Sequence, residues 1–370
     1  MISATRLALA ATGVALLTAC SSDGAATPPT VQPVPSASAL PSTSAGAAAP
    51  TGTPDLDAPE TVATGLNVPW GLAFLPDGSA LVAERDTGRI LQVKPGTPPR
   101  QVRQVDGVDA GGEGGLLGLA VAADHAETGL VYAYFTAADD NRIVRFKLGD
   151  NGAPEVVFDG ITKGPRHNGG RIAFGPDRML YVGTGDASDE PRSQNRDDPS
   201  GKILRLTPDG KPAPGNPWDG SPVWSLGHRN VQGLAWDGQG RMYGIEFGQS
   251  TWDEVNVIEA GKNYGWPEVE GRGDDDRYVN PIVQWSTEEA SPSGAAVAGD
   301  TLYVAGLRGE RLWMVPLGGG TAEAKFTREY GRLRTVAVAP DGSLWLTTSN
   351  TDGRGDRRDG DDRILRFPAR

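Results

Sequence analysis

The sequence has almost no cysteine, since Cys20 is the single thiol among 370 residues. One thiol excludes an intramolecular disulfide framework and any cysteine-based zinc cluster. The chain also lacks an excess of positive charge, because 35 Lys and Arg stand against 47 Asp and Glu, which gives a formal net charge of −12. A general nucleic-acid reader needs a positive field, so nucleic acid is not expected as a partner.

The only apolar run at the start of the chain, Leu7–Leu17, is too short to span a membrane. It follows Arg6 and ends in small residues, a pattern typical of a secretory signal peptide over residues 1–19. The quartet Leu17-Thr18-Ala19-Cys20 resembles a bacterial lipobox, in which the cysteine is lipidated. The alternative is an ordinary signal peptide that happens to contain Cys20. The lipobox interpretation predicts a protein outside the cytoplasmic membrane, held to it by lipid.

Residues 20–58 consist almost wholly of Ala, Pro, Ser, Thr and Gly. Such a composition buries too little apolar area to offset the entropy of ordering, so a disordered tether is expected there. The folded domain is expected to cover residues 59–370.

Glycine and proline are abundant, with 51 and 29 residues, which favours many short strands joined by turns. One pattern of three apolar strands recurs six times, with starts near Trp70, Gly115, Gly170, Val231, Gly294 and Thr335. A repeat of about 40 to 60 residues with this content is typical of a β-propeller. We therefore predict an all-β, six-bladed propeller of four-stranded antiparallel blades. The segment 59–64 is expected to close the ring as the outer strand of the last blade.

Two of the three histidines directly precede an innermost predicted strand in adjacent units. They are His167, in Arg166-His-Asn-Gly-Gly-Arg171, and His228, in Gly227-His-Arg-Asn230. This placement directs them toward the axis and favours a functional role, for His167 more than for His228.

Four arginines are expected to approach the same axis from three units: Arg229, Arg308, Arg332 and Arg334. Several guanidinium groups gathered there would be costly without an anion, so a ligand with several carboxylates is indicated. The acid-rich segment 350–362 lacks EF-hand spacing and is expected to be a solvated charged loop.

Several motifs together resemble the soluble sugar dehydrogenases that depend on pyrroloquinoline quinone (PQQ). The resemblance covers essentially all of 59–370 and rests on motifs that occur in the family's order. They are Leu66-Asn-Val-Pro-Trp70, Gly112-Glu-Gly-Gly-Leu116, His167-Asn-Gly-Gly-Arg171, Gly227-His-Arg-Asn-Val-Gln-Gly233 and Asn263-Tyr-Gly-Trp-Pro267.

The resemblance implies oxidation of the anomeric hydroxyl of an aldose to a lactone, with hydride transfer to PQQ and with Ca²⁺ as a second cofactor. It implies that His167 is the general base, that Asp186 orients it, and that Arg229 stabilises charge on the reduced quinone. The cofactor-binding residues that it implies are Glu113, Arg229, Asn230, Gln232, Arg308, Arg332 and Arg334. Gly248 and Gln249 would offer carbonyl oxygens to Ca²⁺. The electron acceptor is not indicated.

Two other functions remain open at this stage. A metal-dependent hydrolase, such as a lactonase, would need several carboxylates on the axis, for which Glu113, Asp186, Glu246 and Glu289 are available. A cell-surface binding module would keep the propeller without the cofactor.

Overall fold

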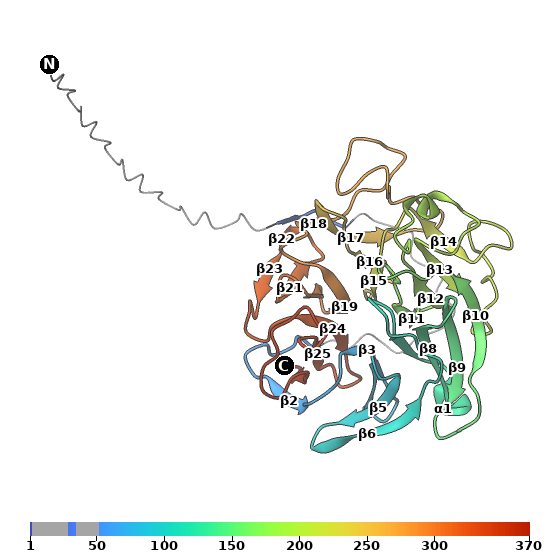
Figure 1. The fold of residues 1–370 in the computed structure, drawn as a ribbon, viewed down its shortest axis with the longest axis vertical. Coiled ribbons are helices and arrows are strands. Elements are labelled where there is room, and N and C mark those ends of the chain that lie inside the picture. Colours follow the sequence, from blue (N-terminus) through green and yellow to red (C-terminus); the bar gives the residue numbers. More distant parts are fainter. Residues whose placement is uncertain (2–28, 35–51) are drawn as a thin grey trace.

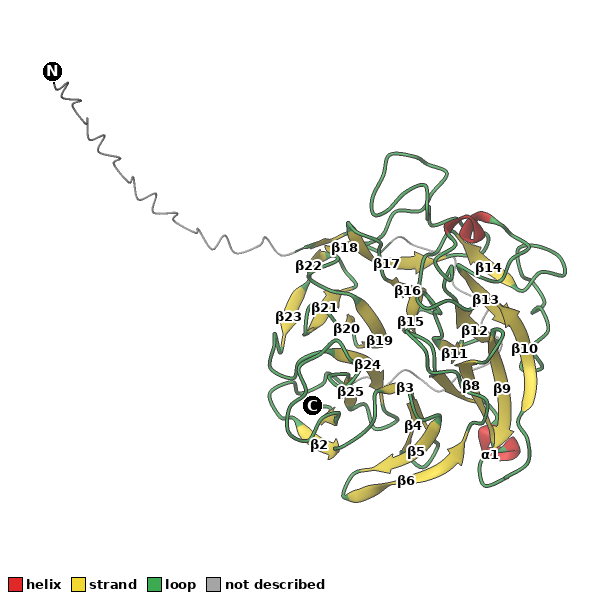
Figure 2. Ribbon diagram, viewed as in Figure 1, coloured by secondary structure: helices red, strands yellow, loops and turns green. Residues whose placement is uncertain are grey.

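The computed structural model describes Met1, residues 29–34 and residues 52–370. In these residues, six four-stranded antiparallel sheets stand side by side in a ring, each forming one blade (Figure 1). The helices of the described residues are short: α1 (His125–Thr128) and the 3₁₀ helix η1 (Glu190–Gln194) (Figure 2). The predicted six-bladed propeller is confirmed.

The first three blades follow one another along the chain, and each runs from its innermost to its outermost strand. The first contains β3 (Pro69–Phe74), β4 (Ala80–Glu84), β5 (Arg89–Lys94) and β6 (Thr97–Gln104). The second contains β7 (Leu116–Val121), β8 (Leu130–Thr136), β9 (Asn141–Lys147) and β10 (Glu155–Ile161). The third contains β11 (Ile172–Phe174), β12 (Leu180–Gly183), β13 (Lys202–Leu206) and β14 (Val223–Leu226).

The other three blades complete the ring, and the last takes its outermost strand from the start of the domain. The fourth contains β15 (Val231–Trp236), β16 (Met242–Glu246), β17 (Trp252–Ile258) and β18 (Val283–Ser286). The fifth contains β19 (Pro292–Ala298), β20 (Thr301–Gly306), β21 (Arg311–Pro316) and β23 (Glu323–Lys325). The sixth contains β24 (Leu333–Val338), β25 (Leu344–Thr348), β26 (Ile364–Phe367) and β2 (Glu60–Ala63).

The strand β2 closes the ring, as expected for residues 59–64. It pairs with β26 in antiparallel register, with Thr61 opposite Leu365. Across the same junction, the rings of Phe74 and Trp345 pack edge to face with centroids 5.1 Å apart. The start of the domain therefore completes the last blade by backbone pairing, and the last blade packs on the first through aromatic side chains.

The repeated Pro-Asp-Gly phrase forms the tight turn between the first two strands of a blade. In the first blade, Asp77 Oδ1 accepts a hydrogen bond from the Ser79 amide at 2.9 Å, and Gly78 has a φ of 80°. In the sixth blade, Asp341 Oδ1 accepts from the Ser343 amide at 3.0 Å. Short Asp side chains that bind their own backbone favour such turns.

The hydrophobic core lies between neighbouring blades. For example, Leu117 and Tyr134 of the second blade are buried in one cluster with Ile172 and Val182 of the third. Because each sheet uses both faces for this packing, the loops at the two ends of the central channel are left for function.

A short strand near the chain start lies against the fifth blade. There β1 (Thr30–Val31) pairs with β22 (Gly320–Thr321), and Val31 is only 1 % exposed. This strand differs from the disordered tether expected over 20–58, because Val31 finds an apolar site beside Val283 and Trp285. The predicted signal peptide and Cys20 lie outside the described residues. Among the residues that are described, no helix has the length and apolar character needed to cross a membrane.

Candidate active site

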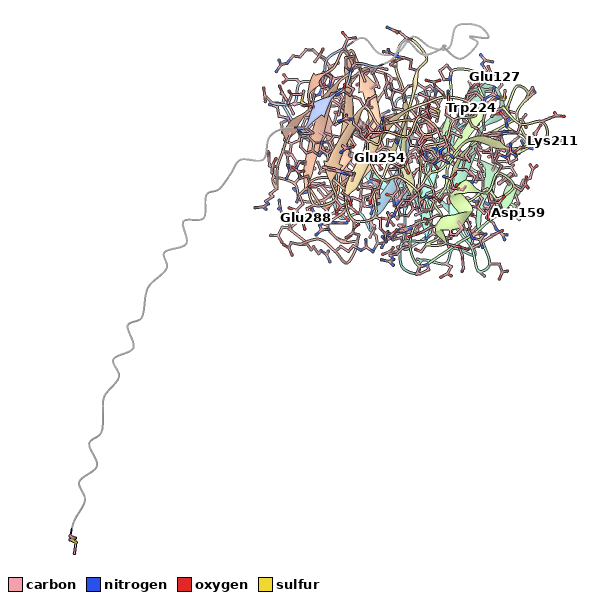
Figure 3. All side chains as sticks on the ribbon, turned by 90° about the horizontal axis from the view of Figure 1, so that it is seen from above. Glu127, Asp159, Lys211, Trp224, Glu254 and Glu288 are labelled. Atoms are coloured by element: carbon pink, nitrogen blue, oxygen red, sulfur yellow. The ribbon has the colours of Figure 1, made fainter. Side chains whose placement is uncertain are left out.

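The loops that precede the innermost strands open on one face of the ring. Glu288 and Asp159 lie toward this face, whereas Glu127 lies toward the opposite one (Figure 3). A cavity of about 400 Å³ occupies the mouth. Five blades contribute to its lining, which consists of Trp70, Arg85, Gly112, Glu113, Gln232, Phe247, Ser291, Leu307, Arg308, Arg332, Arg334, Asp352 and Arg354.

A buried histidine–aspartate pair lies beside this cavity. The Nδ1 of His167 is 2.7 Å from Asp186 Oδ1, and the other carboxylate oxygen, Oδ2, accepts a hydrogen bond from the Trp266 indole at 2.8 Å. Glu113, from the cavity wall, accepts the backbone amide of His167 at 3.0 Å. The pair is thereby joined to the cavity through Glu113.

Glycine allows the two loops that carry this pair to approach each other. A Cβ at Gly185 would lie 1.8 Å from the carbonyl oxygen of His167, so no other residue fits there. His167 itself has a φ of 58°, a left-handed conformation that is uncommon for residues other than glycine. Such local strain is concentrated at functional sites, where the surrounding contacts hold it in place.

The carboxyl group of Asp186 is fully buried yet stays ionised. Burial alone would raise its pKa, but hydrogen bonds from His167, the Ser188 amide and Trp266 hold the pKa below its ordinary value. A charged Asp186 accepts the Nδ1 proton of His167, which leaves Nε2 as the basic nitrogen.

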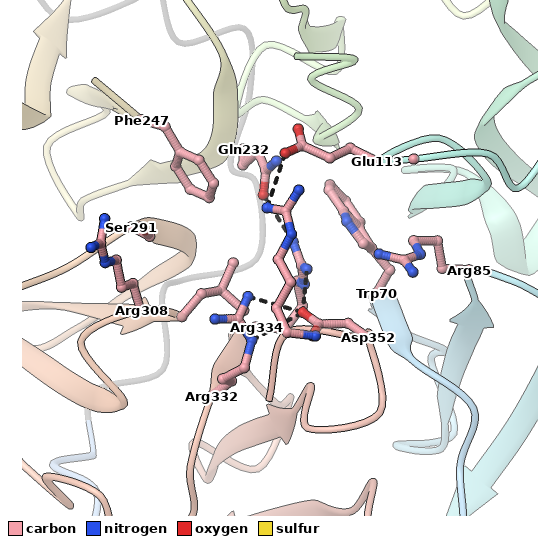
Figure 4. A pocket seen from close by; sticks show the side chains of 13 residues that line it. Trp70, Arg85, Glu113, Gln232, Phe247, Ser291, Arg308, Arg332, Arg334 and Asp352 are labelled. Carbon is pink, nitrogen blue, oxygen red and sulfur yellow. Dashed lines mark hydrogen bonds and ion pairs between the residues drawn. The ribbon is translucent and has the colours of Figure 1, made fainter. Parts of the chain in front are cut away.

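Arg332 and Arg334 of the sixth blade meet Asp352 at the centre of the cavity (Figure 4). Arg332 donates to Asp352 Oδ2 at 3.0 and 3.1 Å, and Arg334 lies 3.5 Å from the same oxygen. Burial lowers the pKa of Arg334 to about 9, although Asp352 opposes this shift. One carboxylate therefore shares two guanidinium groups.

Three further arginines surround this centre. Arg354 forms a 3.2 Å ion pair with Glu113 on the opposite wall. Arg85 donates a hydrogen bond to Asp86. The exposed Arg308 is 3.2 Å from Glu288. The lining as a whole thus carries five guanidinium groups and two carboxylates, Glu113 and Asp352. The mouth of this acidic protein is locally positive.

Two buried donors have no partner among the described residues: Arg334 Nε, in the cavity lining, and Asn230 Nδ2, outside it. Gln232 Oε1 accepts from Arg334 and from Ser293, both at 3.0 Å, while Asn230 Oδ1 accepts the Gly169 amide at 3.0 Å. Unpaired buried donors are costly, so they indicate a place where a ligand acceptor would be stabilising.

Arg229 does not line the main cavity and contacts the loop between β16 and β17. Its Nη1 donates to the Phe247 carbonyl at 3.1 Å, its Nε donates to Gln249 Oε1 at 3.0 Å, and its guanidinium lies over the Trp266 ring. Gly248 and Gln249 belong to this loop. The loop and the His167–Asp186 pair therefore share Trp266 as a neighbour.

The structure thus brings most of the predicted residues to one end of the channel. Arg308 is at the rim, Arg332, Arg334, Gln232 and Glu113 line the cavity, and His167, Asp186, Arg229 and Asn230 lie beside it. The expectation of a solvated loop over 350–362 was wrong in part, because the Asp352 side chain is 2 % exposed and lies between two arginines. Arg85, Asp352, Arg354 and Trp266 were missed, and the only signal for Arg85 was its place directly after a second strand.

The carboxylates that a metal-dependent hydrolase would need do not gather. Glu113 binds the backbone amide of His167, and Asp186 binds its imidazole. Glu246 binds the His228 ring and the Arg229 amide. Glu289 accepts a hydrogen bond from Ser286. Within the described ranges, no group of three or more His, Cys, Asp or Glu is arranged to hold a metal ion.

The fold places this chain among the β-propellers, and its candidate site lies at one end of the central channel. Within that class, a family model described as "Glucose / Sorbosone dehydrogenase" matches residues 66–365. Because this match spans most of the chain, the protein belongs to that family.

Similar proteins are consistent with this assignment. The chain is 32% identical to quinoprotein glucose dehydrogenase B of Acinetobacter calcoaceticus, over 65% of this chain and 59% of that protein. It is 27% identical to the aldose sugar dehydrogenase YliI of Escherichia coli, over 78% and 89% of the two chains. The PQQ-bound structure of an aldose sugar dehydrogenase from Streptomyces coelicolor is 57% identical and superposes with a TM-score of 0.81, over 84% of this chain and 97% of that one.

Proposed function

We propose that this protein oxidises the anomeric hydroxyl of an aldose to a lactone, with PQQ as the hydride acceptor and Ca²⁺ as a second cofactor. The observation that carries the proposal is the arginine-rich cavity beside a buried histidine–aspartate pair. The similarity to a PQQ-bound aldose sugar dehydrogenase supports it.

The residues of the cavity fit a planar tricarboxylate. Arg332 and Arg334 share the single carboxylate of Asp352, so a carboxylate of the ligand would be stabilised beside them. The unpaired Arg334 Nε, in the cavity lining, is a donor that such a ligand would satisfy. When bound, PQQ supplies a two-electron acceptor for the hydride of the sugar.

The protein's part in the reaction is to hold the sugar and take its proton. His167 Nε2 accepts the proton of the anomeric hydroxyl, because Nδ1 is already directed to Asp186. Asp186 keeps the ring oriented and stabilises the imidazolium that results. Glu113, which lines the cavity and accepts a hydrogen bond from the His167 amide, would connect the base to the cofactor site.

The loop after β16 fits a hard cation such as Ca²⁺. No hydrogen bond to the carbonyl oxygens of Gly248 or Gln249 is found within the described residues, so both are available as ligands. Ca²⁺ prefers oxygen ligands of this kind. There it would act as a Lewis acid toward the quinone.

Reconstitution of the purified protein with PQQ and Ca²⁺ tests the proposal. Aldose-dependent reduction of an artificial dye is expected, with a lactone as product. Quinone binding without sugar oxidation would favour a binding module, and failure to bind the quinone would contradict the proposal.

We expect Asp186→Asn to lower kcat by roughly 10- to 100-fold, because the amide no longer fixes the tautomer and orientation of His167. Steady-state kinetics of the reconstituted enzyme measures the effect, and Asp189→Asn, in the exposed turn nearby, is the control. An unchanged kcat in Asp186→Asn would show that Asp186 does not orient the base.

We also propose that Cys20 carries the lipid that holds the protein outside the cytoplasmic membrane. Labelled fatty acid is then expected to attach to the protein, and Cys20→Ser is expected to abolish this labelling. The variant is expected either to be released from the membrane or to keep its signal peptide. Membrane fractionation after a high-salt wash measures retention. Equal retention of Cys20→Ser and wild type would contradict a lipid anchor.

A further inference from the structure

The loop Gly248–Trp252 between β16 and β17 turns five consecutive backbone amides toward two carboxylates. The Gly248 amide donates to Asp253 Oδ1 at 2.9 Å. The next four amides all donate to one oxygen, Glu270 Oε1, at 2.6 Å from Gln249, 3.0 Å from Ser250, 3.0 Å from Thr251 and 3.1 Å from Trp252. Glu270 thus binds almost the entire loop from one side.

This arrangement determines where the carbonyl groups of the loop point. In a planar trans peptide, the N–H of one residue and the C=O of the residue before it are antiparallel. The Gln249 amide that donates to Glu270 therefore turns the Gly248 carbonyl away from Glu270, and the Ser250 amide does the same for the Gln249 carbonyl. Both carbonyls are therefore turned to the side of the loop where a cation would not meet Glu270.

The loop is also tightly closed, so its conformation depends on these contacts. A Cβ at Gly248 would lie 1.8 Å from the Trp252 carbonyl oxygen and 2.6 Å from Glu270 Oε1. The four amides that donate to Glu270 Oε1 fix the orientation of the peptide planes from residue 248 to residue 252.

We propose that Glu270 is a positioning residue for Ca²⁺: it holds the peptide planes of Gly248 and Gln249 so that their carbonyl oxygens form a ready-made half of the cation site. This inference rests on the calcium binding in the proposed function. Glu270 contacts neither the sugar nor the cation, and it acts through the backbone that it orders.

Calcium titration by calorimetry tests the inference without any measurement of activity, on wild type and on Glu270→Ala, each with and without PQQ. The substitution is expected to weaken Ca²⁺ binding by about 10- to 100-fold, as is usual when a group that orients metal ligands is removed. Hydrogen–deuterium exchange of the amides of residues 249–252 is expected to become faster in the same variant. Glu270→Gln keeps an acceptor oxygen without the charge and is expected to restore part of the affinity.

The control is Glu268→Ala, which removes an exposed carboxylate two residues away from the same segment. It is expected to leave both calcium binding and amide exchange unchanged, and a thermal unfolding curve checks that each variant is folded. Calcium binding that is unaffected by Glu270→Ala, despite faster exchange, would overturn the positioning role alone. A wild-type protein that binds no Ca²⁺ under either condition would overturn this inference together with the calcium part of the proposed function.

Discussion

Replacing His167 with alanine is expected to lower kcat by about two to four orders of magnitude, while PQQ remains bound. The reason is that the proton of the anomeric hydroxyl would have no acceptor at the position that Asp186 and Gly185 define for the imidazole. The arginines that line the cavity do not contact the His167 side chain, so the affinity for the quinone is expected to change little.

Single-turnover and steady-state kinetics of the reconstituted variant measure this effect, with the bound quinone followed by its absorbance. His125→Ala is the matched control, because His125 lies in α1 on the opposite face of the propeller. Turnover close to wild type in a fully reconstituted His167→Ala enzyme would show that another group takes the proton.

Removal of Arg332 and Arg334 is expected to weaken PQQ binding in two steps. Each charge-assisted hydrogen bond to a carboxylate contributes about 1.5–3 kcal/mol, which corresponds to a loss of about 10- to 150-fold per arginine. Arg334 is expected to give the larger loss, because its guanidinium is buried and leaves one nitrogen without a partner among the described residues. In the double variant, Asp352 would also face the ligand as an unpaired negative charge.

Calorimetric titration of PQQ in the presence of Ca²⁺ measures these losses. Arg366→Ala is the control, since Arg366 belongs to the same blade but pairs with Glu60 and Asp341 at its outer edge. Binding by both single variants with wild-type affinity would contradict the role of these arginines. If wild type released no heat at high micromolar quinone, the cavity arginines would be neutralised by carboxylates of the protein itself, namely Asp86, Glu113, Glu288 and Asp352.

The sequence by itself determined the architecture, because the signals for it are local and repeated. The Pro-Asp-Gly turns at Asp77 and Asp341 join adjacent strands through bonds within three residues, and six similar units leave few other folds. The motif around His167 and the glycine at Gly185 likewise lie within twenty residues of each other. The pairing of His167 with Asp186 across this hairpin was implied by the family resemblance, and the structure shows the two side chains 2.7 Å apart.

Only the tertiary structure decided which charges meet at the channel mouth. Asp352 and Arg354 come from a segment that resembles a solvated loop in sequence, yet one lies between Arg332 and Arg334 and the other reaches Glu113 across the cavity. Nothing in the sequence around Glu270 indicates its role. In the structure, Glu270 Oε1 accepts hydrogen bonds from the amides of residues 249–252. Ion pairs depend on the distance between side chains in space, and in a closed ring residues far apart in sequence, such as Glu113 and Arg354, are brought within 3.2 Å by the arrangement of the blades.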